Sequence, residues 1–475
     1  MRTARRNTLP ILCTLTLSSA LGLAGCATPS KPDSPPTATA PTAGSAAGDQ
    51  LPDICVDPSL VAPLEPSASM ARGNRRYVLL EQKLARHEQA GEAEAAIDTL
   101  IQLGRLSQRR LHKPDVALAH YMEALKLAHG RSDQEREGRV LILMSWAEVA
   151  LKRYPDATQT LAKAQELYGK MRRPVSLATA TALSAAPYLH MGARDRAEAA
   201  LTTATQTLEP QRKAAKDQTS QLEVGRALLA VGAGHSLLGD KLKSEMALQD
   251  ALSLFVSVGA FREQAEALDR IADMYRQAEQ WERAAAYYGS ELDAQTRLGN
   301  DDGRADSLMD IGEMKLKLGD HNGALEAYKQ ARALYDQLKA EGDETEALTK
   351  MGNAYMLLGQ RPLAFASYFQ ALKHARETGR PARLADSLDD VAEAYIELGD
   401  FQRALHCSQR ELQIWQQLGE QERSAHALLD ISEAYLKLGQ KPQARQALED
   451  GLRFCTAAKR PACEATLRKK LDTTY

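Results

Sequence analysis

The stretch VAEAYIELGDFQRAL at residues 391–405 recurs along the chain at a fixed interval. Forty residues earlier the sequence reads MGNAYMLLGQRPLAF (351–365), and forty residues later it reads ISEAYLKLGQKPQAR (431–445). The three copies share an apolar residue, a small residue, tyrosine, Leu-Gly and then alanine, in that order. Such a period indicates a supersecondary unit that cannot bury its own apolar face and does so only against neighbouring copies.

The repeated residues have helical spacing. Each copy begins with a leucine, and an apolar residue, a small residue and usually a tyrosine follow three, four and seven positions later. The leucines are Leu228, Leu268, Leu308, Leu348, Leu388 and Leu428. Offsets of i, i+3, i+4 and i+7 lie on one face of an α-helix. The Leu-Gly pair then predicts the end of that helix, because glycine readily adopts positive φ; Ala278-Glu279 replaces the pair in one copy and is a weaker stop.

A second helix follows each turn and carries one alanine at the position where two helices would cross. These alanines are Ala284, Ala324, Ala364, Ala404 and Ala444. Upstream, Ala117, Ala157 and Ala197 are again forty residues apart. The step of 47 from Ala197 to Ser244 predicts an insertion of about seven residues within 209–219.

This pattern resembles the tetratricopeptide repeat, whose motif is usually about 34 residues long. The longer spacing, with Leu-Gly also closing second helices at 298–299 and 418–419, is similar to the subclass found in scaffold proteins of the Pins type. The resemblance is strong from 262 to 458 and weak in the first three repeats. It implies an all-α fold: a right-handed superhelical α-solenoid with a concave groove lined by the first helices.

We expect this solenoid to occupy residues 67–475. Counting the repeats, we expect about nine helix pairs between about residues 91 and 458. A lone helix at about 70–89 precedes them, and a polar cap helix at about 461–473 follows them.

The first 26 residues, MRTARRNTLPILCTLTLSSALGLAGC, have the outline of a secretory signal. Arg2, Arg5 and Arg6 precede an apolar run that is too short for a retained membrane helix. The final Leu-Ala-Gly-Cys at 23–26 resembles the lipobox of bacterial lipoproteins. That resemblance implies a signal peptide at 1–25, cleaved before an acylated cysteine.

Acylation of Cys26 would tether the mature chain to a membrane. Ala27 rather than aspartate after it favours, by resemblance to Gram-negative lipoproteins, the outer membrane facing the periplasm of a bacterial cell envelope. The alternative is a plain signal peptide with an incidental cysteine. Residues 26–66 are rich in Pro, Ala, Thr and Ser, and they predict a disordered linker because they lack large apolar groups.

The composition argues against several function classes. The chain has 60 basic and 62 acidic residues, and its formal net charge of −2 gives no reason to expect nucleic-acid binding. The sequence has no phosphate-binding glycine loop, no nucleophile elbow and no His-Glu pair with metalloprotease spacing. We therefore expect no catalytic residues, no cofactor and no metal.

One stripe on the first helices is unusually acidic. When the leucine of each copy is counted as position four, the stripe lies at positions two, five and nine, about 130° from the core face. The residues that we expect to contact a partner in the groove are Glu266, Asp269, Asp273, Asp306, Glu313, Glu346, Asn353, Asp386, Asp389, Glu393 and Glu433. The competing interpretation is a solvated face with acids that complement helix dipoles, but this does not cover the ninth position, over two turns into the helix.

Four cysteines remain beyond Cys26. Cys455 and Cys463 bracket a turn in CTAAKRPAC, so either a disulfide or two reduced thiols can stand there. Cys407 is expected in the core, and Cys55 at the end of the linker is unpaired or intermolecular.

The sequence therefore favours a membrane-anchored lipoprotein that acts as a scaffold or adaptor. Its partner would be a protein of unknown identity that presents a basic or amphipathic segment to the acidic groove. The alternative is a ligand-responsive regulator that binds a peptide or a cell-wall fragment.

Overall fold

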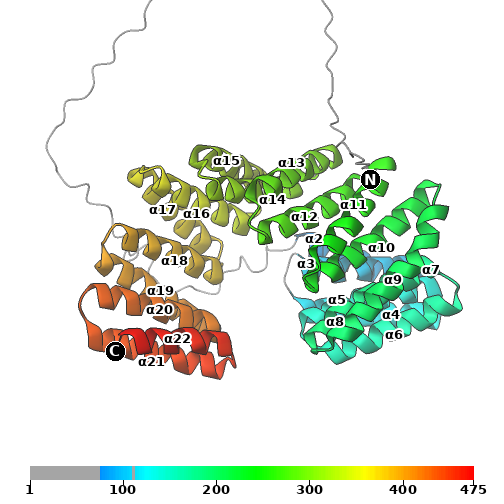
Figure 1. Ribbon diagram of the computed structural model, residues 1–475, viewed down its shortest axis with the longest axis horizontal. Helices are drawn as coiled ribbons and strands as arrows, with labels where there is room; N and C mark the ends of the chain where they lie inside the picture. Colours follow the sequence, from blue (N-terminus) through cyan, green and yellow to red (C-terminus); the bar gives the residue numbers. More distant parts are fainter. Residues whose placement is uncertain (1–74, 110–112, 475) are drawn as a thin grey trace, which may run out of the picture. The chain divides into compact units, whose positions relative to one another are not determined.

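The computed structural model describes residues 75–109 and 113–474, and every element in those ranges is helical (Figure 1). The predicted signal peptide at 1–25, Cys26 and the predicted linker at 26–66 lie outside the described residues. No helix of the described ranges is both long and apolar enough to cross a bilayer.

The helices follow one another with short turns between them. Their bounds are α2 (Arg75–Gln89), α3 (Ala93–Arg109), α4 (Pro114–Gly130), α5 (Gln134–Ala150), α6 (Tyr154–Lys170), α7 (Pro174–Leu183), α8 (Ala185–His190), α9 (Arg194–Ala214), α10 (Gln218–Leu237), α11 (Lys241–Ser257), α12 (Phe261–Gln277), α13 (Trp281–Leu298), α14 (Asp301–Lys317), α15 (His321–Leu338), α16 (Glu341–Leu357), α17 (Arg361–Glu377), α18 (Pro381–Glu397), α19 (Phe401–Leu418), α20 (Gln421–Lys437), α21 (Lys441–Ala457) and α22 (Pro461–Thr474).

Consecutive helices pack as pairs, and each pair packs against the next. Within the described residues the pairs run from α3 with α4 to α20 with α21, while α2 precedes them and α22 follows them. The predicted all-α solenoid of about nine helix pairs is confirmed; the hand of its superhelix stays a prediction.

The first helix of the third pair is broken into α7 and α8 at Ser184. Pro187 accounts for the break, because proline cannot donate the backbone hydrogen bond to residue i−4.

The two helices of a pair approach closely where a small residue of the first helix meets a tyrosine of the second. Gly312 faces Tyr328 and Gly352 faces Tyr368, so closely that a Cβ added at either glycine would clash with the ring. Both rings are about 1% exposed. The repeated phrase therefore has a small residue on the first helix because the tyrosine ring of the second helix fills the space beside it.

The turn inside each pair ends the first helix in the way that the Leu-Gly motif predicts. At Gly399, with φ of 75°, the glycine N–H donates to the Ile396 carbonyl at 3.0 Å, and the next N–H donates to the Tyr395 carbonyl at 2.9 Å. These bonds satisfy carbonyls at the helix end. Glu279 takes the same left-handed conformation with φ of 55°, although its side chain makes that conformation less favourable.

The extra residues between Ala197 and Ser244 lengthen two helices. α9 has 21 residues and α10 has 20, against 17 in α11. Pro210 lies inside α9 and Asp217 caps α10 by accepting from the Ser220 N–H at 3.0 Å. The insertion is therefore accommodated as helix with only a short connection between α9 and α10.

The crossing can be tested with one glycine substitution. We expect Gly352→Ala to destabilise the protein by about 1–2 kcal/mol, because the clash with Tyr368 costs more than the gain in helix propensity. Gly289→Ala is the matched control, since Gly289 lies within α13 with no heavy atom within 4 Å of an added Cβ. The control should stabilise by about 0.5–1 kcal/mol. Thermal unfolding of both variants measures the difference, and equal shifts would contradict the steric explanation.

Candidate functional site

The first helices of successive pairs contact one another along the predicted acidic stripe. Between α16 and α18, the Asn353 amide donates to Asp390 at 2.8 Å. One turn earlier, the Thr349 and Ser387 hydroxyl groups lie 3.2 Å apart. Stripe positions of α16 therefore contact residues that stand next to the stripe positions of α18, although the two helices are separated by a complete second helix in the sequence.

The predicted acids differ in their exposure. Asp306, Glu313 and Glu393 are exposed, whereas the others are partly buried. Five of them form ion pairs with basic residues that stand outside the stripe positions. These pairs are Glu266 with Arg270, Asp273 with Arg276, Glu346 with Arg383, Asp386 with Arg423 and Glu433 with Lys470. The stripe positions of the five copies from Leu268 to Leu428 carry no Lys or Arg, whereas the copy at Leu228 has Arg226 there. Because of the ion pairs, the surface is less negative than those positions alone indicate.

Tyrosines of second helices hold several stripe residues in place. The Tyr288 hydroxyl donates to Asp273 at 2.9 Å, and the Tyr335 hydroxyl donates to Asp306 at 2.8 Å. The Tyr288 ring is buried at a helix crossing, so its hydroxyl reaches the stripe from the core. Core packing and stripe geometry are therefore coupled through the same side chain.

Three acids gather between α12 and α14, and we call them the α12–α14 triad: Asp269, Glu291 and Asp310. Glu291 comes from α13 and is only 7% exposed. Burial, with the charge of Asp269 as a second cause, raises the pKa of Glu291 to about 8. Burial also raises the pKa of Asp310 to about 7 and that of Asp269 to about 6. The charge of Asp269 adds to the shift of Asp310, and the charge of Asp273 adds to the shift of Asp269.

A second set has the same construction 120 residues later, and we call it the α18–α20 triad: Asp389, Glu411 and Asp430. Each of the three offers a carboxylate oxygen within 4.8 Å of the other two. Glu411 comes from α19 and is 4% exposed. Burial raises its pKa to about 9, with the charge of Asp389 as the next cause. Burial likewise raises the pKa of Asp430 to about 7 and that of Asp389 to about 6.

Four members of these triads were missed by the sequence reasoning, and each had a signal in the repeat pattern. Glu291 and Glu411 occupy a second-helix position at which the neighbouring copies carry a small residue. Those small residues are Ala251, Ala331, Ala371 and Gly451. Asp310 and Asp430 stand one position after the stripe position of their helices. Both triads could therefore have been recognised by a glutamate at a position where the other copies have a small, buried residue.

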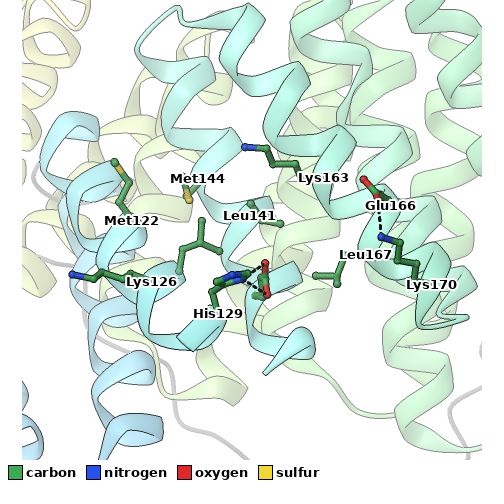
Figure 2. Close-up of a pocket in the computed structure, with 11 residues that line it drawn as sticks. Met122, Lys126, His129, Leu141, Met144, Lys163, Glu166, Leu167 and Lys170 are labelled. Carbon is green, nitrogen blue, oxygen red and sulfur yellow. Dashed lines mark hydrogen bonds and ion pairs between the residues drawn. The ribbon is translucent and has the colours of Figure 1, made fainter. Parts of the chain in front are cut away.

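A separate pocket of about 520 Å³ lies between α4, α5 and α6 (Figure 2). Its apolar lining comes mainly from leucine and methionine side chains, and its rim carries both signs of charge. The lining residues are Met122, Leu125, Lys126, His129, Glu137, Leu141, Met144, Lys163, Glu166, Leu167 and Lys170. At the rim, His129 Nδ1 lies 3.3 Å from a Glu137 carboxylate oxygen, and Lys170 forms an ion pair with Glu166 at 2.6 Å (Figure 2).

The cysteines near the C-terminus link the last repeat to the final helix. Cys455 and Cys463 form a disulfide that joins α21 to α22, with Cα atoms 5.7 Å apart. Cys407 is fully buried in α19, as expected, and it is also disulfide-bonded, which the sequence reasoning did not assign. Cys55 lies outside the described residues.

Stacked helix pairs with this small-residue and tyrosine packing define a class of protein, the helical-repeat arrays. Residues 263–337 and 383–457 match the tetratricopeptide repeat family. These two segments cover the repeats that carry both triads. The assignment to a 40-residue subclass stays a prediction. No curated protein matches the chain.

Several solved structures have a similar fold. The apo form of RapI is 12% identical with a TM-score of 0.50, over 80% of this chain and 99% of that one. A signal transduction ATPase with a tetratricopeptide repeat sensor from Pyrococcus horikoshii is also 12% identical, with a TM-score of 0.46 over 82% and 54% of the two chains. Yeast Tom70 is 13% identical, with a TM-score of 0.40 over 85% and 92%. At these identities the similarity to RapI shows the fold alone.

The buried carboxyl of α13 makes stability depend on pH. Folding raises the pKa of Glu291 from 4.5 to about 8, so its favourable contribution is complete below pH 4.5 and is lost as the pH rises through about 8. Glu291→Gln removes this dependence, also relieving repulsion with Asp269 of α12 and Asp310 of α14. We expect the variant to gain on the order of 2 kcal/mol relative to wild type between pH 5 and pH 8.5.

Urea unfolding of the full chain at both pH values measures this gain. Glu326→Gln, at an exposed acid of α15, is the control and should show no such difference between the two pH values. A Glu291→Gln variant whose stability follows that of wild type at both pH values would contradict the assignment.

Proposed function

We propose that the protein is a scaffold or adaptor whose acidic stripe binds a basic segment of a partner protein. The single observation that carries this proposal is the approach of stripe acids to an acid of the next first helix. Asp269 and Asp273 of α12 lie close enough to Asp310 of α14 to raise its pKa, and Asp389 and Glu393 of α18 have the same effect on Asp430 of α20. A lysine- or arginine-rich segment would neutralise several of these carboxylates at once.

The match of two segments to the tetratricopeptide repeat family supports a role in protein–protein interaction. Arginines already pair with part of the stripe, so the proposed contact concentrates on acids without such partners, Glu313 and Glu393 among them. A binding role of this kind requires no catalytic residue and no cofactor.

The proposed role includes the lipid anchor at Cys26. It is supported by the lipobox-like Leu-Ala-Gly-Cys at 23–26 and by the Pro- and Ala-rich composition of 26–66. An anchored array would hold its partner near the outer membrane, on the periplasmic side. The anchor and the stripe are separate parts of the proposal, and each has its own test.

The pocket between α4, α5 and α6 favours a second candidate function, the binding of a small ligand. Leu141 and Met144 give it an apolar base, and Lys126 and Lys163 form no ion pair among the described residues. A peptide or cell-wall fragment with an apolar part and a carboxylate would fit that chemistry. We rank this candidate second because the pocket lies outside the repeats that carry the acidic stripe.

Charge reversal tests the stripe. The probe is a fluorescent amphipathic peptide of about 20 residues with lysines on one face. We expect Glu313→Lys combined with Glu393→Lys to weaken its binding at least about fivefold, since both acids are exposed on the stripe. Wild-type affinity should also fall as NaCl rises from about 50 to about 300 mM. Fluorescence anisotropy measures both effects.

The matched control reverses two exposed acids of second helices, Glu282 of α13 and Glu326 of α15. This variant has the same net charge as the stripe variant and should bind the peptide as wild type does. Equal losses in the two variants would reduce the effect to net charge alone and contradict a specific acidic stripe.

Substitution of the predicted lipidated residue tests the anchor. We expect Cys26→Ala to move the protein from the membrane fraction to the soluble fraction and to abolish labelling with radioactive palmitate, because the acyl chains provide the membrane affinity. Cys55→Ala is the control and should leave both unchanged. A Cys26→Ala protein that stays in the membrane fraction would contradict the proposed anchor, whatever the outcome of the peptide experiment.

A further inference from the structure

The α18–α20 triad contains a carboxylate that the protein itself leaves unsatisfied. Glu411 is 4% exposed, and its Oε1 accepts from the Trp415 indole N–H at 2.8 Å. Its Oε2 is buried and has no hydrogen-bond partner. An unpaired buried carboxylate oxygen is costly, so its presence indicates a ligand that the chain does not supply.

Two other carboxylates lie close to that of Glu411. Asp389 from α18 and Asp430 from α20 each place an oxygen within 4.8 Å of Glu411 and of each other. In the described residues, one group of three or more His, Cys, Asp or Glu side chains has this spacing, and it is this triad. Three helices from two successive pairs therefore each contribute one carboxylate to the same cluster.

Basic residues near the triad are engaged with other acids. Arg423 pairs with Asp386 at 3.4 Å and lies over the Trp415 ring at 5.3 Å. Lys470 pairs with Glu433 at 3.6 Å. In the described part of the chain, no ion pair joins a basic side chain to Asp389, Glu411 or Asp430. Arg423 lowers the pKa of Asp389 and Lys470 lowers that of Asp430, so these two residues offset part of the triad's charge and a bound cation would offset the rest.

We infer that the α18–α20 triad binds a calcium ion through Asp389, Glu411 and Asp430. Oxygen-only donors select hard cations. Calcium–oxygen bonds of about 2.3–2.6 Å allow two oxygens of one ion to lie up to about 5 Å apart, so three oxygens within 4.8 Å of one another fit around one calcium ion. Magnesium requires a near-ideal octahedron and gives up its bound water reluctantly, so three side chains from three separate helices suit calcium better.

The open sides of the site fit calcium as well. Asp389 and Asp430 are only partly buried, so water can complete the six to eight oxygen ligands that calcium prefers. Three monodentate protein ligands give a weak site, and we expect a dissociation constant on the order of 0.1–1 mM. This inference is independent of the proposed partner and of the lipid anchor.

The α12–α14 triad provides an internal comparison, because its three acids have the same types and the same sequence positions 120 residues earlier. It lacks the two features that indicate a ligand. The Glu291 carboxylate accepts from the Gln295 amide at 3.2 Å, and it has no orphaned oxygen. Its three acids do not form a group with the 4.8 Å spacing. Residue 295 corresponds to Trp415, so the indole is also particular to the α18–α20 triad.

That indole allows a site-specific measurement. Terbium(III) is a hard cation similar in size to calcium, and it luminesces when a nearby excited tryptophan transfers energy to it. We would titrate the full chain with TbCl3, excite tryptophan, and then add CaCl2 or MgCl2 at equal ionic strength. We expect saturable terbium emission that calcium displaces at a concentration at least about fivefold below that of magnesium.

Four substitutions decide the assignment. Glu411→Gln and Asp430→Asn should each weaken terbium and calcium binding at least about tenfold, because each removes one charged ligand. The matched controls Glu291→Gln and Asp310→Asn should stay within about twofold of wild type. Asp430 is partly buried, so Asp430→Asn tests the site even if Glu411→Gln fails to fold.

Three outcomes would overturn the inference: no saturable emission in wild type, unchanged binding in Asp430→Asn, or equal losses in the α12–α14 controls. Displacement by magnesium at the same concentration as calcium would overturn the choice of ion. None of these outcomes affects the peptide experiment, which uses Glu313 and Glu393.

Discussion

The close contact between a small residue on one helix and a tyrosine ring on the next is the constraint on which the rest of this structure depends. In α16 and α17 the ring of Tyr368 occupies the space that a Cβ at Gly352 would need. The same contact recurs between Gly312 and Tyr328. Because each pair is held together in this way, its remaining apolar side is available to the next pair, and the stacked array buries a continuous core.

The same tyrosines connect the core with the candidate binding surface. The ring of Tyr288 fills a crossing while its hydroxyl donates to Asp273, and the Tyr368 hydroxyl donates to Asn353 at 2.5 Å. A residue that is conformationally locked by packing therefore orients a stripe residue. This arrangement gives the stripe a defined geometry with little additional loss of side-chain entropy on binding.

The two buried glutamates are the main departure from the packing rule. Glu291 and Glu411 occupy alanine positions, and the close spacing of the array leaves their carboxyls beside aspartates from two first helices. Such placement raises the pKa of each carboxyl and costs folding free energy wherever the group is ionised. Costly buried charges are concentrated at functional sites, which is why these positions rather than the exposed acids lead to the calcium inference.

The sequence by itself determined the helix pairs, their turns and the acidic stripe, because these depend on local spacing: a helical period, a glycine at a helix end and a forty-residue repeat. It did not determine which acids meet. Asp389, Glu411 and Asp430 are separated by about twenty residues at each step, and their approach within 4.8 Å depends on the angles at which three helices cross. The sequence also did not predict the ion pairs between the stripe and nearby arginines. Arg423 reaches Asp386 only because successive first helices lie side by side. Only the tertiary structure decided these contacts, because the angle at which two helices cross sets the distance between their side chains, and the forty-residue period does not specify that angle.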